Sequence, residues 1–531
     1  MRTSRRLLAV LAVLVAGVGL LLVPSAAVGR TGRPDVQSRT ATRPIVHGRD
    51  GGASEHQPTS LDVFAHRSRP RVSMHGAPMD QGTRVPGMLS GFDGLADPIS
   101  VPSDTTGALG DSFFVVAVNT QVAVYDRTGV QVVAPIQLDA LHPDSVGHFT
   151  FDPKVVYDQY TDTFLVVYLV EEDAPRQSLI LTVAIPNATA NITSTWCSTS
   201  FPGDALPSSP QVWADYPGVG YNDTRVTITT NQFTFPSSLG RFRYSQVMTI
   251  DKGGLYDCTQ PRPTPIVFGG TQTRDANGFQ AHTIRPAETA GAAPGAQLLL
   301  SFRPVQGKLD YLVIWRIKPT ASGFSLNKAC CGFTGKVSTP PPGTQGGGGL
   351  NNSDLFWDAG DTRLINAFYD ADRNELFAAH TVFRDFKPDT LTGGYPEAAV
   401  RWYEVDPGAK LKNTVIARKG TVGAAEVDVG WPSVASDSTG TLFVTYSRAS
   451  NPRGEFLSAW VATIPASSST ATQVLVHAGS SRYDAINGVE RWGDYTAINR
   501  DPLDGQGMAV VNQYAASSDQ WQQFISVVTD N

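Results

Sequence analysis

Residues 152–186 read DPKVVYDQYTDTFLVVYLVEEDAPRQSLILTVAIP, three apolar runs separated by polar turns. Short runs rich in Val, Ile, Leu and Tyr, bounded by Asp, Gly, Asn and Thr, are typical of antiparallel strands. Beyond the first 25 residues, no stretch of ten or more shows the 3.6-residue apolar period of an amphipathic helix. This stretch therefore predicts a meander of three strands.

Six further stretches repeat this layout, each with a short first strand and then stronger apolar strands. The seven units begin near Asp104, Asp152, Asp215, His282, Asp361, Gly430 and Asp494, at spacings of 48 to 79 residues. A β-propeller has repeats of about 40–50 residues per blade. A pair of β-sandwiches would explain the strands but not their recurrence. We therefore predict an all-β fold, with a seven-bladed β-propeller over residues 96–531.

The first 27 residues have the features of an export signal. A basic start, MRTSRR, precedes an apolar run of 17 residues, and Ser25-Ala26-Ala27 fits a small-x-small cleavage site. An uncleaved membrane anchor is the alternative, because this run nearly spans a bilayer. Residues 28–95 are basic and poor in aromatic residues, which predicts a disordered leader. We expect a secreted, extracellular protein, with cell-surface attachment as a further option.

The charge of the chain argues against nucleic acid as a partner. The 42 Lys and Arg face 48 Asp and Glu, and removing residues 1–27 takes away three arginines and no acids, which leaves a net charge of −9. An acidic surface repels a phosphate backbone. We expect an extracellular glycan or cell-surface polymer as partner, membrane contact only through an uncleaved signal, and a monomeric chain.

Four cysteines in an exported chain indicate disulfides. Cys197 and Cys258 flank one strand-rich segment and are our candidates for a bridge. Cys330 and Cys331 are adjacent, and the sequence does not determine how they pair. None of the spacings resembles a zinc site.

A tetrapeptide recurs as WADY at 213–216 and as WGDY at 492–495. In a propeller, the first strand of each blade lines the central channel, and its start shares a face with the end of the second strand. The aspartates of both tetrapeptides open first strands, and the matching second strands end near Asn231 and Asn512. We therefore expect these distant residues to converge on one funnel.

The funnel residues carry the candidate chemistry. Asp215 and Asp494 are our candidate catalytic carboxylates, because paired carboxylates hydrolyse glycosidic bonds. Aromatic faces, amides and guanidinium groups would contact the substrate, and our candidates for this role are Trp213, Tyr216, Asn231, Arg303, Arg448, Trp492, Tyr495 and Asn512.

Each of these assignments has a structural alternative. The aspartates would cap turns and tie blades together, the aromatic residues would pack between blades, and the arginines would pair with the aspartates. The sequence has no motif for a catalytic cofactor. The aspartates that open the first strands form an acidic ring, and a structural Ca²⁺ held by their carboxylates is one further interpretation of it.

Four motifs resemble a family of secreted bacterial proteins within the sialidase-like, BNR-type β-propeller group. They are SDTTGALGDSFFVVAVNTQVAVYDRTG, DPKVVYDQYTDTFLVVYL, WADYPGVGYN and WGDYTAINRDP. The resemblance covers about residues 98–531 and implies a sialidase-like propeller. The chain departs from sialidases at their Asp boxes, so no sialidase residue is transferred to it.

Two functions follow as hypotheses. The first is a glycan-recognising propeller, with glycoside hydrolysis at the central channel as its enzymatic form. The second is a non-catalytic adhesion module that binds protein or carbohydrate at the cell surface, since a fold does not fix a function. An oxidoreductase is a third class, for which the chain has no cofactor motif.

Overall fold

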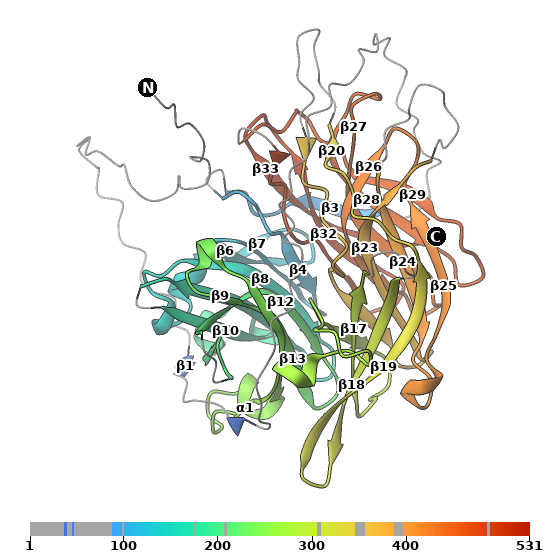
Figure 1. The fold of residues 1–531 in the computed structure, drawn as a ribbon. Coiled ribbons are helices and arrows are strands. Elements are labelled where there is room, and N and C mark those ends of the chain that lie inside the picture. The colour runs from blue at the N-terminus through green and yellow to red at the C-terminus, as the bar shows by residue number, and fades with distance from the viewer. Residues whose placement is uncertain are drawn as a thin grey trace, which may run out of the picture. The chain divides into compact units, whose positions relative to one another are not determined.

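The computed structural model describes residues 88–97, 100–174, 176–206, 210–304, 310–345, 356–386, 397–485 and 489–530, and the short strands at 37–39 and 45–46 (Figure 1). The signal predicted at residues 1–27 and most of the predicted leader lie outside these residues. Within the described part, no helix is long and apolar enough to cross a membrane. Strands dominate the structure, which confirms the all-β prediction.

Seven antiparallel meanders of four strands can be followed through the described residues, and we number them sheets I to VII. Sheet I contains β4 (Thr106–Leu109), β5 (Phe113–Val118), β6 (Gln121–Asp126) and β7 (Gln131–Gln137). Sheet II contains β8 (Thr150–Asp158), β9 (Thr163–Glu172), β10 (Gln177–Pro186) and β11 (Cys197–Pro202). Sheet III contains β12 (Val212–Tyr221), β13 (Arg225–Thr234), β14 (Phe242–Asp251) and β15 (Ile266–Phe268).

The second half of the chain continues this pattern. Sheet IV contains β16 (Arg285–Ala290), β17 (Gln297–Arg303), β18 (Asp310–Thr320) and β19 (Gly323–Gly335). Sheet V contains β22 (Ala367–Asp370), β23 (Glu375–Arg384), β24 (Glu397–Asp406) and β25 (Val415–Val422). Sheet VI contains β26 (Asp428–Ser436), β27 (Leu442–Ser450), β28 (Glu455–Ile464) and β29 (Thr472–His477). Sheet VII contains β31 (Ala497–Arg500), β32 (Met508–Ala515), β33 (Trp521–Val528) and β3 (Met88–Asp93).

The remaining elements are short. Strands β20 (Gly343–Thr344), β21 (Phe356–Trp357) and β30 (Val489–Glu490) form a small separate sheet. One α-helix, α1 (Lys252–Tyr256), is described. The 3-10 turns are η1 (Leu138–Ala140), η2 (Pro143–Ser145), η3 (Asn187–Thr189), η4 (Thr193–Thr195), η5 (Ser237–Leu239), η6 (Gly270–Thr273) and η7 (Leu411–Asn413).

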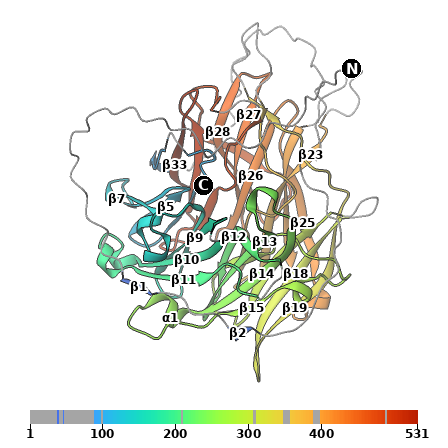
Figure 2. The same ribbon diagram turned by 60° about the vertical axis from the view of Figure 1, so that its left-hand side comes forward.

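The first strands of the seven meanders surround a shared axis. Each contacts the first strand of the next meander, in the order β4, β8, β12, β16, β22, β26, β31 and back to β4. Strands β16 and β22 also pair in parallel, which joins sheets IV and V into one sheet of eight strands. Figures 1 and 2 show the sheets following one another from blue through green to red. Meanders arranged around an axis in this way have the architecture of a β-propeller.

The predicted leader contributes three strands to this architecture. Strand β3 pairs antiparallel with β33, so the folded part begins before residue 96, where we expected it. Strands β1 (Gln37–Arg39) and β2 (Ile45–Val46) pair in parallel with β11 and β15, at the outer edges of sheets II and III. Unpaired edges favour such additions, because they present free backbone N–H and C=O groups.

Packing between sheets explains the near-continuous apolar runs of the sequence. In β5, all residues from Phe114 to Val118 are buried, because both faces of the sheet are covered. Strands covered on both faces have uninterrupted apolar runs, whereas strands with one wet face alternate.

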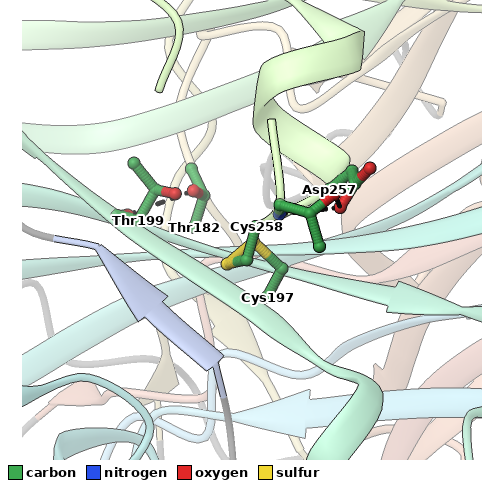
Figure 3. Close-up of a disulfide and its surroundings, with 6 residues drawn as sticks. Thr182, Cys197, Thr199, Asp257 and Cys258 are labelled. Atoms are coloured by element: carbon green, nitrogen blue, oxygen red, sulfur yellow. Dashed lines mark hydrogen bonds between the residues drawn. A yellow bond between two sulfur atoms is a disulfide. The ribbon is translucent and has the colours of Figure 1, made fainter. Parts of the chain in front are cut away.

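The predicted bridge between Cys197 and Cys258 is confirmed, with the two Cα atoms 5.5 Å apart (Figure 3). Cys197 opens β11 of sheet II, and Cys258 follows α1, which comes after the third strand of sheet III. The bridge therefore links two neighbouring sheets. Cys330 in β19 is also disulfide-bonded.

Candidate functional site

A residue with positive φ lies at or near the start of every first strand. In five meanders a residue other than glycine has a left-handed backbone there, with φ of 49° to 56°: Asp104, Asp152, Tyr216, Thr283 and Trp431. Sheets V and VII have glycines of positive φ near the same place, Gly360 and Gly493. Such a backbone costs about 1–3 kcal/mol for a residue with a Cβ. Its recurrence means that neighbouring contacts stabilise it.

Side chains of the preceding sheet supply those contacts. They accept a hydrogen bond from the backbone N–H of the left-handed residue, at 2.8 to 3.2 Å. The donor and acceptor pairs are Asp152 with Asn119, Tyr216 with Asp152, Thr283 with Asn231, and Trp431 with Thr381. Asp152 and Asn231 therefore tie adjacent sheets together, as the structural alternative predicts.

Four aspartates from sheets I, II, III and VII converge at the axis, and we call Asp104, Asp152, Asp215 and Asp494 the axial carboxylate cluster. The Asp494 N–H donates to Asp104 Oδ1 at 2.8 Å. The Tyr495 hydroxyl donates to Asp152 Oδ2 at 2.8 Å. Asp104 and Asp152 are buried, whereas Asp215 and Asp494 are half-buried. Of the four, Asp215 and Asp494 therefore retain access to solvent.

Burial and the charges of neighbouring carboxylates raise the pKa of three members of this cluster. Burial, followed by the charge of Asp494, raises the pKa of both Asp104 and Asp152. Burial and the charge of Asp152 raise the pKa of Asp215 to about 8, although Arg363 opposes the shift. A carboxyl group with such a pKa is largely protonated at neutral pH, so Asp215 has a proton to donate.

Two tyrosines lie beside the carboxylates, surrounded by cations. The rings of Tyr216 and Tyr495 are 5.2 Å apart. Arg285 and Arg363 place their guanidinium carbons 4.3 and 4.0 Å from the centre of the Tyr216 ring. Lys154 Nζ lies 3.2 Å from the centre of the Tyr495 ring. These cation–π contacts fix the tyrosines at the axis.

The arginines differ in accessibility. Arg285 is 1% exposed, and its Nε donates to the Leu364 carbonyl at 2.8 Å, so it has a structural role. The side chain of Arg363 is 24% exposed and pairs with Asp361 at 2.6 Å. The side chain of Arg491 is 45% exposed and pairs with Asp494 at 2.9 Å. Arg363 and Arg491 are thus the guanidinium groups that a ligand could reach.

A small cavity of about 30 Å³ lies among the first strands, with room for ordered water. Its walls come from all seven meanders and include Lys154, Arg285 and Glu288. Burial raises the pKa of Glu288 to about 8, and burial together with Arg285 lowers the pKa of Lys154 well below its usual value. Gly218 also lines the cavity. A larger residue would be crowded at this position, because its Cβ would lie 2.7 Å from Thr229 Oγ1 and 2.9 Å from Arg285 Nη1.

Several residues predicted to bind substrate are engaged elsewhere. Arg448 pairs with Glu455 at 3.0 Å and covers the Trp460 ring within sheet VI. Asn512 Nδ2, on sheet VII, donates to Thr445 Oγ1 of sheet VI at 3.0 Å. The structure therefore gives Arg448 and Asn512 packing and inter-sheet contacts, as the structural alternative predicts.

Trp492 is 1% exposed, and its Nε1–H donates to Ser447 Oγ at 2.9 Å. Its ring packs against Tyr483 with the centres 5.0 Å apart. The equivalent Trp213 is half-buried and contacts Phe151 and Phe233. The two tryptophans of the doublet thus have different surroundings, and only Trp213 is open to a ligand.

Trp492→Phe should lower the free energy of unfolding by about 1–3 kcal/mol, because it removes the donor to the buried Ser447 hydroxyl. The binding of a glycan ligand by Trp492→Phe should be unchanged. Urea unfolding and a binding titration, with Trp213→Phe alongside, check both statements. A binding defect in the stable, folded Trp492→Phe protein would return Trp492 to the site.

The charge of Arg303, a residue predicted to bind substrate, acts on His282. The guanidinium carbon of Arg303 is 4.6 Å from the centre of the Phe279 ring. Burial, then Arg363, and to a smaller extent Arg303 lower the pKa of His282 to about 4. His282 is therefore neutral at physiological pH and serves as a ring and hydrogen-bonding group rather than a cation.

The sequence analysis did not identify the ionisable residues of the cavity wall, Lys154, Arg285 and Glu288. A usable signal was the proline that follows three left-handed residues, at Pro153, Pro217 and Pro432. Aligning these prolines places Lys154, Gly218 and Ser433 at equivalent positions, and all three line the cavity.

Among the described residues, no group of three or more His, Cys, Asp or Glu side chains is arranged to hold a metal ion. The axial carboxylates instead bond to backbone N–H, amide and hydroxyl groups. The calcium reading of the acidic ring thus has no ligand set in this part of the chain.

The pKa of Asp215 predicts a pH-dependent stability. The folded state holds the proton up to about pH 8, whereas the usual carboxyl value is 3.8. This stabilisation is complete below the unfolded pKa and is lost as the pH rises through the folded one. The melting temperature of the wild type should therefore fall relative to that of Asp215→Asn between pH 5 and pH 8.

Asp126→Asn provides the control for this measurement. Asp126 is half-buried, and hydrogen bonds from Thr128 and Val130 lower its pKa, so its contribution is constant over the same interval. Melting temperatures of the wild type and Asp215→Asn that change equally between pH 5 and pH 8 would contradict a protonated Asp215 in the folded state.

Comparison with known proteins gives structural likenesses only. No family model matches the sequence, and no curated protein matches it. A Dyadobacter fermentans protein of unknown function is 10% identical, with 71% of this chain and 93% of that chain covered and a TM-score of 0.41. The GH93 α-L-arabinofuranosidase of Fusarium graminearum is 9% identical, with coverage of 83% and 98% and a TM-score of 0.38. Trypanosoma rangeli sialidase is 9% identical, with coverage of 77% and 58% and a TM-score of 0.34.

Proposed function

We propose that this chain is a secreted, sialidase-like propeller of seven blades that recognises glycans at the axial carboxylate cluster and hydrolyses glycosidic bonds there. One observation carries the proposal. Asp215 is half-buried, has a pKa of about 8, and interacts with the charges of Asp152, Arg363 and Asp494. Two carboxyl groups in different environments are what glycoside hydrolysis requires.

The reaction would use both carboxyl groups. Asp215 would donate its proton to the glycosidic oxygen as the bond from that oxygen to the anomeric carbon breaks. A water molecule would add its hydroxyl group to the anomeric carbon and give its proton to Asp494. Arg363 and Arg491 would orient polar groups of the sugar, because their side chains are partly exposed.

A panel of aryl glycosides and polysaccharides tests this proposal with the purified full chain. We expect turnover of at least one substrate and its loss in Asp494→Asn. Absence of turnover on the whole panel, or unchanged kinetics in Asp494→Asn, would remove the enzymatic reading.

A non-catalytic glycan-binding module is the second candidate. The sheet-to-sheet bonds of Asp104 and Asp152 favour it, because they give buried carboxylates a structural role. Binding on a glycan array without hydrolysis of the bound glycans would establish this candidate in place of the first.

A further inference from the structure

A line of aromatic side chains crosses sheets II, III and IV on the side of the molecule where the first strands begin. We call it the aromatic track, and it consists of Phe149, Phe151, Trp213, Phe233, Phe242 and His282. Successive ring centres lie 5.6, 6.3, 5.6, 5.9 and 4.5 Å apart. Every ring thus contacts the next, although three separate sheets contribute them.

The track is open to solvent along its length. Phe149 is 66% exposed, and the other five residues are half-buried. Core aromatic residues of this protein, such as Trp315 and Trp402, are fully buried. Contiguous exposed aromatic surface on a soluble domain marks a binding site.

The inner end of the track reaches the axial site. His282 precedes the left-handed Thr283, and the charges of Arg363, Arg285 and Asp361 act on its ring. Arg363 in turn stacks on Tyr216, beside Asp215. A chain bound along the track would therefore arrive at the proposed catalytic carboxylates.

Polar groups border the outer part of the track. His148 Nδ1 lies 3.3 Å from Glu172 Oε1, and both side chains are about one-third exposed. Asp173 accepts hydrogen bonds from Ser237, in the turn between β13 and β14, at 2.9 and 3.0 Å. Flat apolar faces flanked by carboxylate and hydroxyl groups match a polyhydroxylated ring, which has an apolar face and a hydrogen-bonding rim. A lipid chain or an aliphatic protein surface would remove water from these partly exposed polar groups and offer them no hydrogen bonds in return, which carries a cost.

We infer that the aromatic track binds an extended, neutral polysaccharide over several successive sugar units and leads it to the axial cluster. This inference rests on the proposed function and names its substrate class, a polymer in place of a single terminal sugar. Affinity should therefore increase with chain length until the track is filled.

Affinity gel electrophoresis of the full chain tests the inference, with soluble xylan, arabinan, mannan and hydroxyethyl cellulose as probes. We expect at least one polymer to retard the wild type, and Phe151→Ala/Phe233→Ala to bind it about tenfold more weakly, because each aromatic contact contributes a fewfold. Phe149→Ala should weaken binding in the same direction, and its exposed position leaves folding intact. Phe333→Ala is the matched control, because Phe333 is an exposed aromatic residue on β19, at 58% exposure.

The outcomes separate this inference from the proposed function. Equal retardation of the wild type and of all track variants would overturn the inference and leave glycan recognition standing. Turnover of aryl glycosides without retardation by any polymer would also overturn the inference alone. Neither turnover nor retardation would overturn both.

Discussion

Asp215→Asn is expected to lower kcat/KM by 10²- to 10⁴-fold on the glycosides that the wild type hydrolyses, the usual contribution of a general acid. The variant keeps the shape and hydrogen-bonding capacity of the side chain but has no acidic proton. Aryl glycosides with weakly basic leaving groups need little protonation and should lose less activity. The comparison of leaving groups therefore distinguishes a lost acid from a distorted site.

The pH profile of the wild type gives a second view of the same proton. In the proposed mechanism Asp215 acts in its protonated form, so activity should fall as the pH rises through about 8. Asp126→Asn, at the end of β6, should keep both the rate and the profile of the wild type. An Asp215→Asn protein with an unchanged rate and pH limb would show that another group is the acid.

Cys197→Ser/Cys258→Ser is expected to lower the free energy of unfolding by about 4 kcal/mol, from the loop entropy that the bridge removes from the unfolded chain. The bridged residues are 61 positions apart, and the loop includes the first three strands of sheet III. Urea unfolding measures the difference. The wild type in a reducing buffer should approach the stability of the variant.

The contradicting outcome for the disulfide is equally specific. A loss below about 1 kcal/mol would contradict the entropic account and would mean that the unfolded chain keeps the segments around Cys197 and Cys258 close together without the bridge.

The recurrence of strands was readable from the sequence, because each meander is buried on both faces and so repeats an apolar run. The predicted unit starts, from Asp104 to Asp494, lie within six residues of the starts of β4, β8, β12, β16, β22, β26 and β31, whereas the number of blades stays a prediction. The closing strand β3 was missed, since its six residues, MLSGFD, have no strong apolar pattern and pair with β33 at the other end of the chain. Such long-range pairing leaves little trace in a local window.

The candidate site was predictable in position but not in detail. The WADY and WGDY repeats located Asp215 and Asp494 at the axis, because equivalent strand starts converge in a ring. The same repeat implied equivalent roles for Trp213 and Trp492, and the structure separates them. Packing against Tyr483 buries Trp492, whereas Trp213 meets the half-buried ring of Phe151. Neighbours from other sheets decide exposure, and the repeat itself does not contain them.

Direct titration of the Asp215 carboxyl group, by difference infrared spectroscopy of the wild type against Asp215→Asn, tests whether the carboxyl groups of different sheets meet at one axis. We expect a pKa of about 8, and a lower value in Asp152→Asn, because the charge of Asp152 on another sheet helps to raise it. A pKa near 4 that is indifferent to Asp152→Asn would contradict the convergence of these carboxyl groups at one axis.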